Sequence, residues 1–166
     1  MKKKLLLFTL LLALVLTAAG CSSKENEEED PASQKDVVSD LDNDVLESFL
    51  NQYNLDAENP INSDDLEITD DNTATCKVTD LDLTFATKED GTLTISAKFS
   101  DLDDENLDVV IRDLIIAMDS ELTYDNVKDM FSAMRDDGRK NYEMGDVKCK
   151  LKESKGTYTL TISNES

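Results

Sequence analysis

The sequence predicts an α+β fold, a two-layer sandwich in which antiparallel β-hairpins pack against about three helices. Two observations predict it. Apolar residues recur every three or four positions in three segments, and they alternate with polar residues in four others. The predicted order along the chain is α-β-β-α-α-β-β. Strands with one apolar face need helices over that face, and this favours two layers.

The first helix is expected over residues 37–53, followed by a loop over residues 54–63 that contains Pro60. The apolar residues of the helix are spaced so that they share one face: Val38, Leu41, Val45, Phe49 and Tyr53.

The first hairpin joins strands expected at 81–85 and 93–99. A three-residue loop from Glu89 to Gly91 sets Phe85 opposite Ile95, so both apolar rows lie on one face. A two-residue turn would set apolar residues opposite polar ones. The three-residue loop is therefore preferred, with its glycine in the left-handed conformation.

The segment before this hairpin is out of phase with it. Cys76 and Val78 have the opposite parity to Leu81. This predicts a β-bulge or a strand break near Thr79 and Asp80.

Two helices follow. Asp103 or Asp104 can cap the first, Thr123 can cap the second, and Gly138 is suited to end the second. Their apolar stripes are Leu107, Val110, Ile111, Leu114, Ile115 and Met118 for the first, and Val127, Met130, Phe131 and Met134 for the second.

A second hairpin closes the chain across a turn at Lys155 and Gly156, with a loop of either two or four residues. Its alternating apolar residues are Val147, Cys149 and Leu151 on one strand and Tyr158, Leu160 and Ile162 on the other. Residues 91–96 resemble residues 157–163, which suggests duplicated halves.

The N-terminus has the layout of an export signal. Lys2, Lys3 and Lys4 precede an apolar run over residues 5–19, shorter than the roughly 20 residues that a membrane-spanning helix needs. The segment 18–21, Ala-Ala-Gly-Cys, resembles the bacterial lipobox. The resemblance implies cleavage after Gly20 and lipid attachment at the Cys21 sulfur, which would hold the protein on the extracytoplasmic face of the cell membrane.

Three parts of the chain are therefore expected. Residues 1–20 form the signal peptide, residues 21–36 a lipidated N-terminus and disordered acidic tether, and residues 37–166 a single α+β domain. Cleavage would remove three lysines and leave 14 basic against 37 acidic side chains, a net charge of −23. This charge disfavours binding to nucleic acids and to anionic lipid headgroups.

The chain has no histidine. Its absence excludes Ser-His-Asp and Cys-His nucleophilic centres and zinc sites that need imidazole. Carboxylate-only catalysis, as in glycosidases, is not excluded, because it needs only two suitably spaced acids. No cofactor, metal or catalytic residue is predicted.

Two acidic clusters have the spacing of candidate calcium ligands: one at Asp40, Asp42 and Asp44, the other at Asp101, Asp103 and Asp104. A calcium-binding helix-loop-helix needs Gly at its sixth position and Glu at its twelfth. For the first cluster these positions hold Val45 and Asn51. Both clusters are instead placed where acids cap helices.

Cys76 and Cys149 both fall in predicted strands. Outside the cytoplasm they could form a disulfide, worth about 4 kcal/mol in the chain-entropy model. The alternative is two buried, reduced thiols that pack as small apolar residues.

The segment 122–127, Leu-Thr-Tyr-Asp-Asn-Val, followed by a helix and a hairpin, is similar to small lipoproteins of the envelope-assembly and β-lactamase-inhibitor type. The predicted function is a non-catalytic binding or envelope-maintenance module with a protein or small-molecule partner. The alternatives are a carboxylate-based enzyme acting on envelope glycans and a calcium-responsive surface protein.

Overall fold

Seven antiparallel strands form one sheet in the order β1-β2-β3-β4-β7-β6-β5. The computed structural model describes residues 41–164. The strands are β1 (Glu67–Asp70), β2 (Thr73–Val78), β3 (Leu81–Thr87), β4 (Leu93–Phe99), β5 (Asn141–Met144), β6 (Val147–Ser154) and β7 (Thr157–Ser163). The helices are α1 (Asp44–Asn54), the 3-10 turn η1 (Ser63–Asp65), α2 (Glu105–Met118) and α3 (Tyr124–Asp136).

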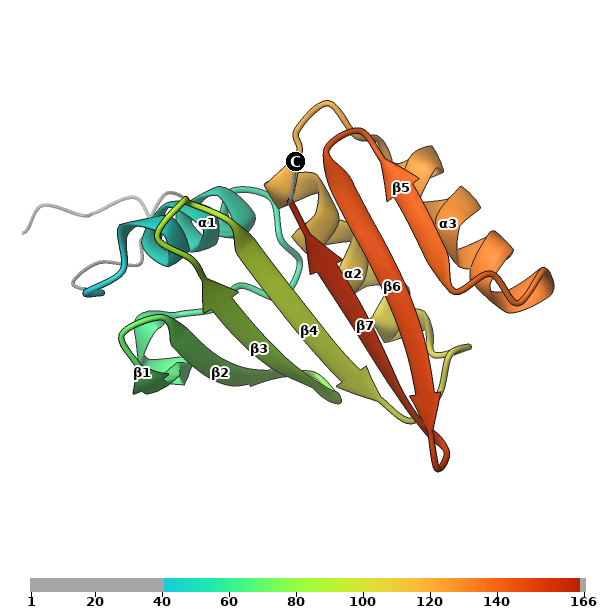
Figure 1. Ribbon diagram of the computed structural model, residues 1–166, viewed down its shortest axis with the longest axis horizontal. Helices are drawn as coiled ribbons and strands as arrows, with labels where there is room; N and C mark the ends of the chain where they lie inside the picture. Colours follow the sequence, from blue (N-terminus) through green and yellow to red (C-terminus); the bar gives the residue numbers. More distant parts are fainter. Residues whose placement is uncertain (1–40, 165–166) are drawn as a thin grey trace, which may run out of the picture. The chain divides into compact units, whose positions relative to one another are not determined.

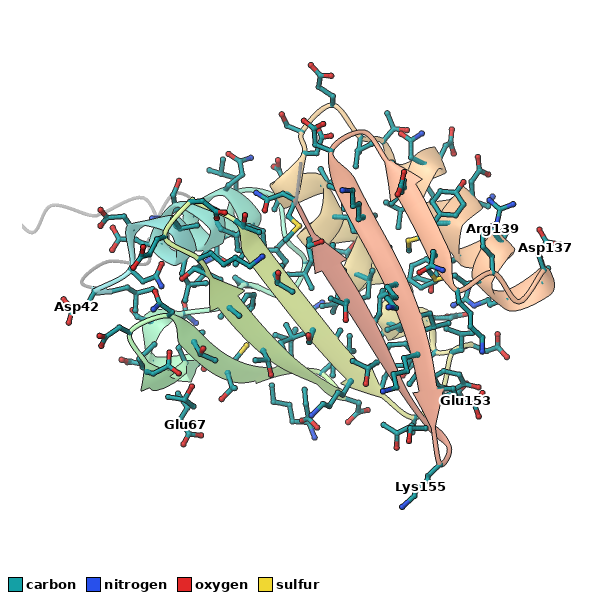
Figure 2. The ribbon with its side chains drawn as sticks, in the orientation of Figure 1. Asp42, Glu67, Asp137, Arg139, Glu153 and Lys155 are labelled. Carbon is teal, nitrogen blue, oxygen red and sulfur yellow. The ribbon has the colours of Figure 1, made fainter. Side chains whose placement is uncertain are left out.

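Helices α2 and α3 lie behind the strands in Figure 1, which looks onto the helix-free face of the sheet. Figure 2 shows the side chains from the same side, with Glu153 and Lys155 near the tip of the β6–β7 hairpin. One face of the central strands is buried with the helices in a single hydrophobic core. The predicted α+β class is therefore confirmed.

The predicted order is incomplete, because four strands precede α2 and three follow α3. The two edge strands, β1 and β5, have four residues each. All of β1 is exposed, and β5 carries only two alternating apolar residues, Tyr142 and Met144. Strand β2 was seen only as an out-of-phase segment. Of the two predicted alternatives at Thr79 and Asp80, the strand break is confirmed: β2 ends at Val78 and β3 begins at Leu81. The break is a two-residue hairpin turn, with Thr79 at φ 54° and Val78 paired with Leu81.

The predicted registers of both hairpins hold. Phe85 pairs with Ile95, as the three-residue loop requires, and Gly91 has a positive φ of 86°. In the second hairpin the loop has two residues, Lys155 and Gly156, both with positive φ. This is the combination that a tight type I′ turn needs.

The helix starts follow the capping residues. Asp104 caps α2 by accepting a hydrogen bond from the Asn106 N–H, and Thr123 caps α3. The first helix was predicted to start too early. The side chain of Asn43 caps α1 by accepting from the Leu46 N–H, and residues 41–43 are not helical.

No helix within residues 41–164 is long and apolar enough to cross a membrane. The predicted signal peptide, the cleavage after Gly20, the Cys21 lipid site and the acidic tether lie outside the described residues.

Candidate functional site

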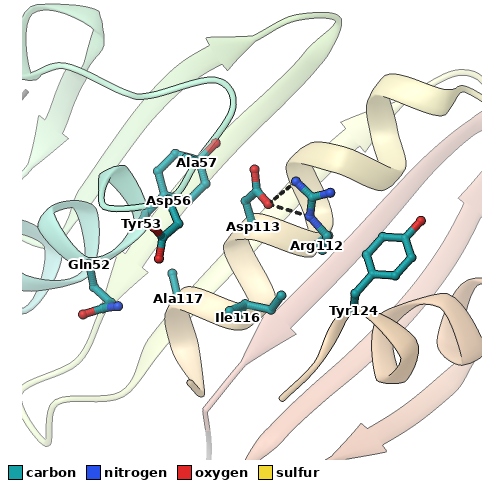
Figure 3. Close-up of a pocket in the computed structure, with 9 residues that line it drawn as sticks. All are labelled: Gln52, Tyr53, Asp56, Ala57, Arg112, Asp113, Ile116, Ala117 and Tyr124. Carbon is teal, nitrogen blue, oxygen red and sulfur yellow. Dashed lines mark hydrogen bonds and ion pairs between the residues drawn. The ribbon is translucent and has the colours of Figure 1, made fainter. Parts of the chain in front are cut away.

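A groove of about 440 Å³ opens on the helical side of the domain, where α1, α2 and the start of α3 meet. Figure 3 shows α2 between the residues from α1 and its following loop on one side and Tyr124 on the other. The lining is mostly apolar. Its residues are Gln52, Tyr53, Asp56, Ala57, Arg112, Asp113, Ile116, Ala117 and Tyr124.

The wall contributed by the loop after α1 is held by buried polar contacts. The side-chain amide of Asn54 bonds both backbone groups of Ile61, at 2.8 and 2.9 Å. The Tyr53 hydroxyl donates to the Asn59 carbonyl at 2.8 Å. Burial raises the pKa of Tyr53 well above its ordinary value, so the phenol stays protonated and keeps donating.

Arg112 is fixed in the groove by two carboxylates. Its guanidinium lies 2.6 Å from Asp113 and 2.9 Å from Glu58. Partial burial lowers the pKa of Arg112, but hydrogen bonds to Glu58 and Asp113 outweigh this effect and leave the pKa raised. Asp113 also accepts from the Glu58 backbone N–H at 3.1 Å, so it ties α2 to the loop after α1.

Tyr124 is the most exposed large hydrophobic residue in the described part of the chain, with 56% of its surface accessible. Its ring lies beside Arg112, with 5.7 Å between the ring centroid and the guanidinium carbon. A cation beside an aromatic face is attracted by the ring quadrupole. The pair therefore presents a pre-arranged aromatic and planar cationic surface at one end of the groove.

The groove combines an apolar lining with excess negative charge. Asp56 and Asp113 line it and Glu58 borders it, against the single cation of Arg112. Such a site favours a ligand that carries an apolar body and a positive charge. Asp113 is already paired with Arg112 at 2.6 Å.

Of the two alternatives for the cysteines, the structure has free thiols: Cys76 and Cys149 lie on β2 and β6, with β3, β4 and β7 between them. Four strand spacings separate them by about 19 Å, whereas a disulfide needs Cα atoms within about 7 Å. Burial raises the pKa of each thiol to about 12, so both are unreactive at neutral pH.

Of the acidic residues in the two clusters, Asp104 is the one that caps a helix, α2, whereas α1 is capped by Asn43. Asp101 accepts from the Asp103 N–H at 2.9 Å within the loop before α2. Asp44 lies in the first turn of α1, and Asp40 lies outside the described residues. Within residues 41–164, no three acids or cysteines are grouped to hold a metal ion.

Sequence reasoning missed the groove. Arg112 had no role in the prediction, and Tyr124 entered it only within the segment 122–127, because both fall outside the apolar stripes of their helices. The available signal was weak: an arginine inside a strongly apolar helix, and an aromatic residue directly after the helix cap at Thr123.

Comparisons with protein-family models, with curated proteins and with solved structures find no match to this chain. Its function is therefore argued from its own residues.

Proposed function

We propose that this chain is a lipid-anchored, extracytoplasmic binding module without catalytic activity, which holds a cationic and apolar segment of a partner protein in the groove between α1, α2 and α3. The observation that carries the proposal is the pre-arranged pair of Arg112 and Tyr124 beside an apolar groove with an acidic border. Arginine and tyrosine are enriched among the residues that dominate protein interfaces.

The rigidity of the site supports a binding role. Arg112 already makes its ion pairs, and Asn54 already orders the loop that carries Asp56 and Glu58. A site that is ordered before binding avoids part of the entropy cost of association. The partner then needs only to place an apolar side chain over Ile116 and Ala117 and a positive charge near Asp56.

The anchoring part of the proposal is supported by the N-terminal sequence. A lysine-flanked apolar run ending in Ala-Ala-Gly-Cys at positions 18–21 suits export followed by lipid attachment at Cys21. The acidic composition of residues 22–36 suits a tether that separates the groove from the membrane surface.

The binding test uses the full chain in detergent micelles and two fluorescent octapeptides, one with alternating Leu and Lys and one with alternating Leu and Glu. Fluorescence anisotropy should detect binding of the Leu-Lys peptide alone. Tyr124→Ala should weaken it about tenfold or more, in the range of a binding hot spot. Asp56→Asn should weaken it several-fold, because it removes a border charge.

Two matched controls separate the groove from the rest of the surface. Ile68→Ala removes another exposed hydrophobic side chain, on β1, and Asp129→Asn removes a carboxylate on α3. Both should leave the affinity unchanged. Equal loss in the Tyr124 and Ile68 variants would contradict a specific role for the groove.

We also propose that the two halves of the domain arose by duplication. The sheet order supports this, because β2-β3-β4 mirrors β5-β6-β7 about the centre and a helix, α1 or α3, precedes each set. Residues 92–96 and 159–163 have the same sequence, Thr-Leu-Thr-Ile-Ser, and Ile95 pairs with its counterpart Ile162. An experimental structure whose halves do not superpose under a rotation of about 180° would refute the proposal.

A further inference from the structure

The helix-free face of the sheet carries a row of lysines along β6, at the opposite side of the sheet from the groove. Lys148, Lys150 and Lys152, called the lysine row below, alternate along the strand, so they point to the same side. All three are exposed. Alternate strand residues are about 6.8 Å apart. Within residues 41–164, none of the three forms an ion pair.

Each lysine of the row lies directly opposite a hydroxyl on β7. The pairs are Lys148 with Ser163, Lys150 with Thr161, and Lys152 with Thr159. A shallow hollow of about 290 Å³ lies over this region, and two of the lysines and two of the hydroxyl residues line it, together with Glu143, which lies opposite Lys148 on β5. The surface therefore repeats one unit, a cation beside a hydroxyl, three times along the strand.

The charge of this face is opposite in sign to that of the whole chain. The chain has a formal net charge of −20. On the helix-free face, by contrast, the strand registers place five lysines and four acids: Lys77, Lys98, Lys148, Lys150, Lys152, Glu67, Asp70, Asp82 and Glu143. Charges beyond about 8 Å are largely screened at physiological salt, so a ligand at the row experiences the local positive charge.

The shortage of aromatic groups narrows the class of ligand. Tyr142 and Tyr158 pair with Cys149 and Phe99, residues of the buried face, so neither lies in the same row as the lysines, and Tyr142 is the one aromatic residue among those that line the hollow. Single-stranded nucleic acids are held largely by stacking of their bases on aromatic residues. Protein partners usually bury apolar anchors. A polyanion without bases needs neither aromatic residues for stacking nor apolar anchors.

We propose that the lysine row binds a linear polyol phosphate, with consecutive phosphates at successive lysines and the polyol hydroxyls at Thr159, Thr161 and Ser163. The spacing is compatible. Six backbone bonds join alternate residues of a strand, and six bonds also join consecutive phosphorus atoms in a chain of 1,3-linked glycerol phosphate. Phosphates accept hydrogen bonds from lysine and from Ser or Thr hydroxyls.

The test measures binding of 1,3-linked poly(glycerol phosphate) to the full chain in uncharged detergent micelles by calorimetry. The variant Lys148→Gln/Lys150→Gln/Lys152→Gln should lose at least tenfold in affinity. It should also reduce the slope of log Kd against log salt by about 2. The matched control Lys128→Gln/Lys140→Gln/Lys155→Gln has the same change in net charge and should bind as the unmodified chain does.

A second variant keeps the charge: Lys148→Arg/Lys150→Arg/Lys152→Arg should retain binding, and its unfolding midpoint should match that of the unmodified chain. Polyglutamate of equal charge and millimolar inorganic phosphate serve as competing probes, and both should compete poorly. No binding of poly(glycerol phosphate), equal loss in the control variant, or equal affinity for polyglutamate would overturn the proposal. The last result would identify an acidic peptide as the partner instead.

Discussion

The side chain of Asn54 hydrogen-bonds both backbone groups of Ile61, donating to its carbonyl at 2.8 Å and accepting from its N–H at 2.9 Å. The amide thereby replaces the partner strand that these backbone groups would have in a sheet. Both residues are buried, so water cannot take over the contacts. This pair holds the loop that supplies Asp56, Ala57 and Glu58 to the groove.

Asn54→Ala is expected to lower the free energy of unfolding by about 2–4 kcal/mol, because it leaves two buried backbone groups without partners. Urea denaturation followed by circular dichroism measures the change. Lys128→Ala, at an exposed position on α3, is the control and should change stability by less than about 0.5 kcal/mol. A change of similar size in both variants would contradict the role of Asn54.

Arg135 is expected to stabilise the packing of α3 against the start of α2. Its guanidinium donates to the Leu102 carbonyl at 2.8 and 2.6 Å and to the Asp108 carboxylate, and it lies 4.8 Å from the Phe131 ring centroid. Arg135→Met should cost about 2 kcal/mol.

Arg135→Lys keeps the charge but loses the planar guanidinium, whose several N–H groups bond Leu102 and Asp108 together. The stability of this variant should therefore lie between those of Arg135→Met and the unmodified chain. Thermal and urea denaturation of the three proteins would check this order. A lysine variant as stable as the unmodified chain would show that a positive charge at position 135 is enough to stabilise the packing, without the planar guanidinium.

The two thiols predict loss of stability at high pH. Burial raises the pKa of Cys76 and Cys149 from 9.0 to about 12 in the folded chain. The contribution of each protonated thiol to the free energy of unfolding is fully present below pH 9. It is lost as the pH rises towards 12, because only the unfolded chain releases these protons in that range. Between these pH values, each thiol should lower the free energy of unfolding by about 1.4 kcal/mol per pH unit.

Denaturation at pH values from 8 to 11 should show a shallower decline for Cys76→Ala/Cys149→Ala than for the unmodified chain. In the folded protein at pH 7, both thiols should react with a thiol reagent only after denaturant is added. Rapid reaction of Cys149 in the native state would contradict its burial.

The proposed anchor predicts a defined mass for the mature protein. In a bacterium that processes lipoproteins, mass spectrometry should find residues 1–20 removed and a diacylglycerol on the Cys21 sulfur. Cys21→Ala should abolish the modification and reduce recovery in the membrane fraction. An unmodified thiol on membrane-bound mature protein would refute the anchor.

The sequence predicts the elements that have a strong apolar period. The wide stripe from Leu107 to Met118 fixes α2, and the matched parity of Phe85 and Ile95 fixes the β3–β4 register. Strand β1 was missed because exposed residues need no alternation: Ile68 is 53% exposed. Strand β5 was missed because two alternating apolar residues, Tyr142 and Met144, are too few to indicate a strand. The Thr79 turn was missed because a threonine with positive φ has no sequence signature.

The candidate site was harder to predict than the fold. The groove depends on how three helices approach one another, and no periodicity in the sequence encodes that approach. The choice between a disulfide and two free thiols could not be made from the sequence for a related reason. Strand membership of Cys76 and Cys149 was right, but the order of the strands decides their separation, and β7 returns to the centre of the sheet beside β4.

The most direct test of the binding account is two-dimensional NMR of the ¹⁵N-labelled full chain in micelles, titrated with the Leu-Lys octapeptide. The account predicts shift changes confined to the groove, at residues 52–57, 112–117 and 124, with the β6 and β7 signals unmoved. Shift changes centred on any other surface would contradict it. So would the absence of shift changes at peptide concentrations far above the Kd measured by anisotropy.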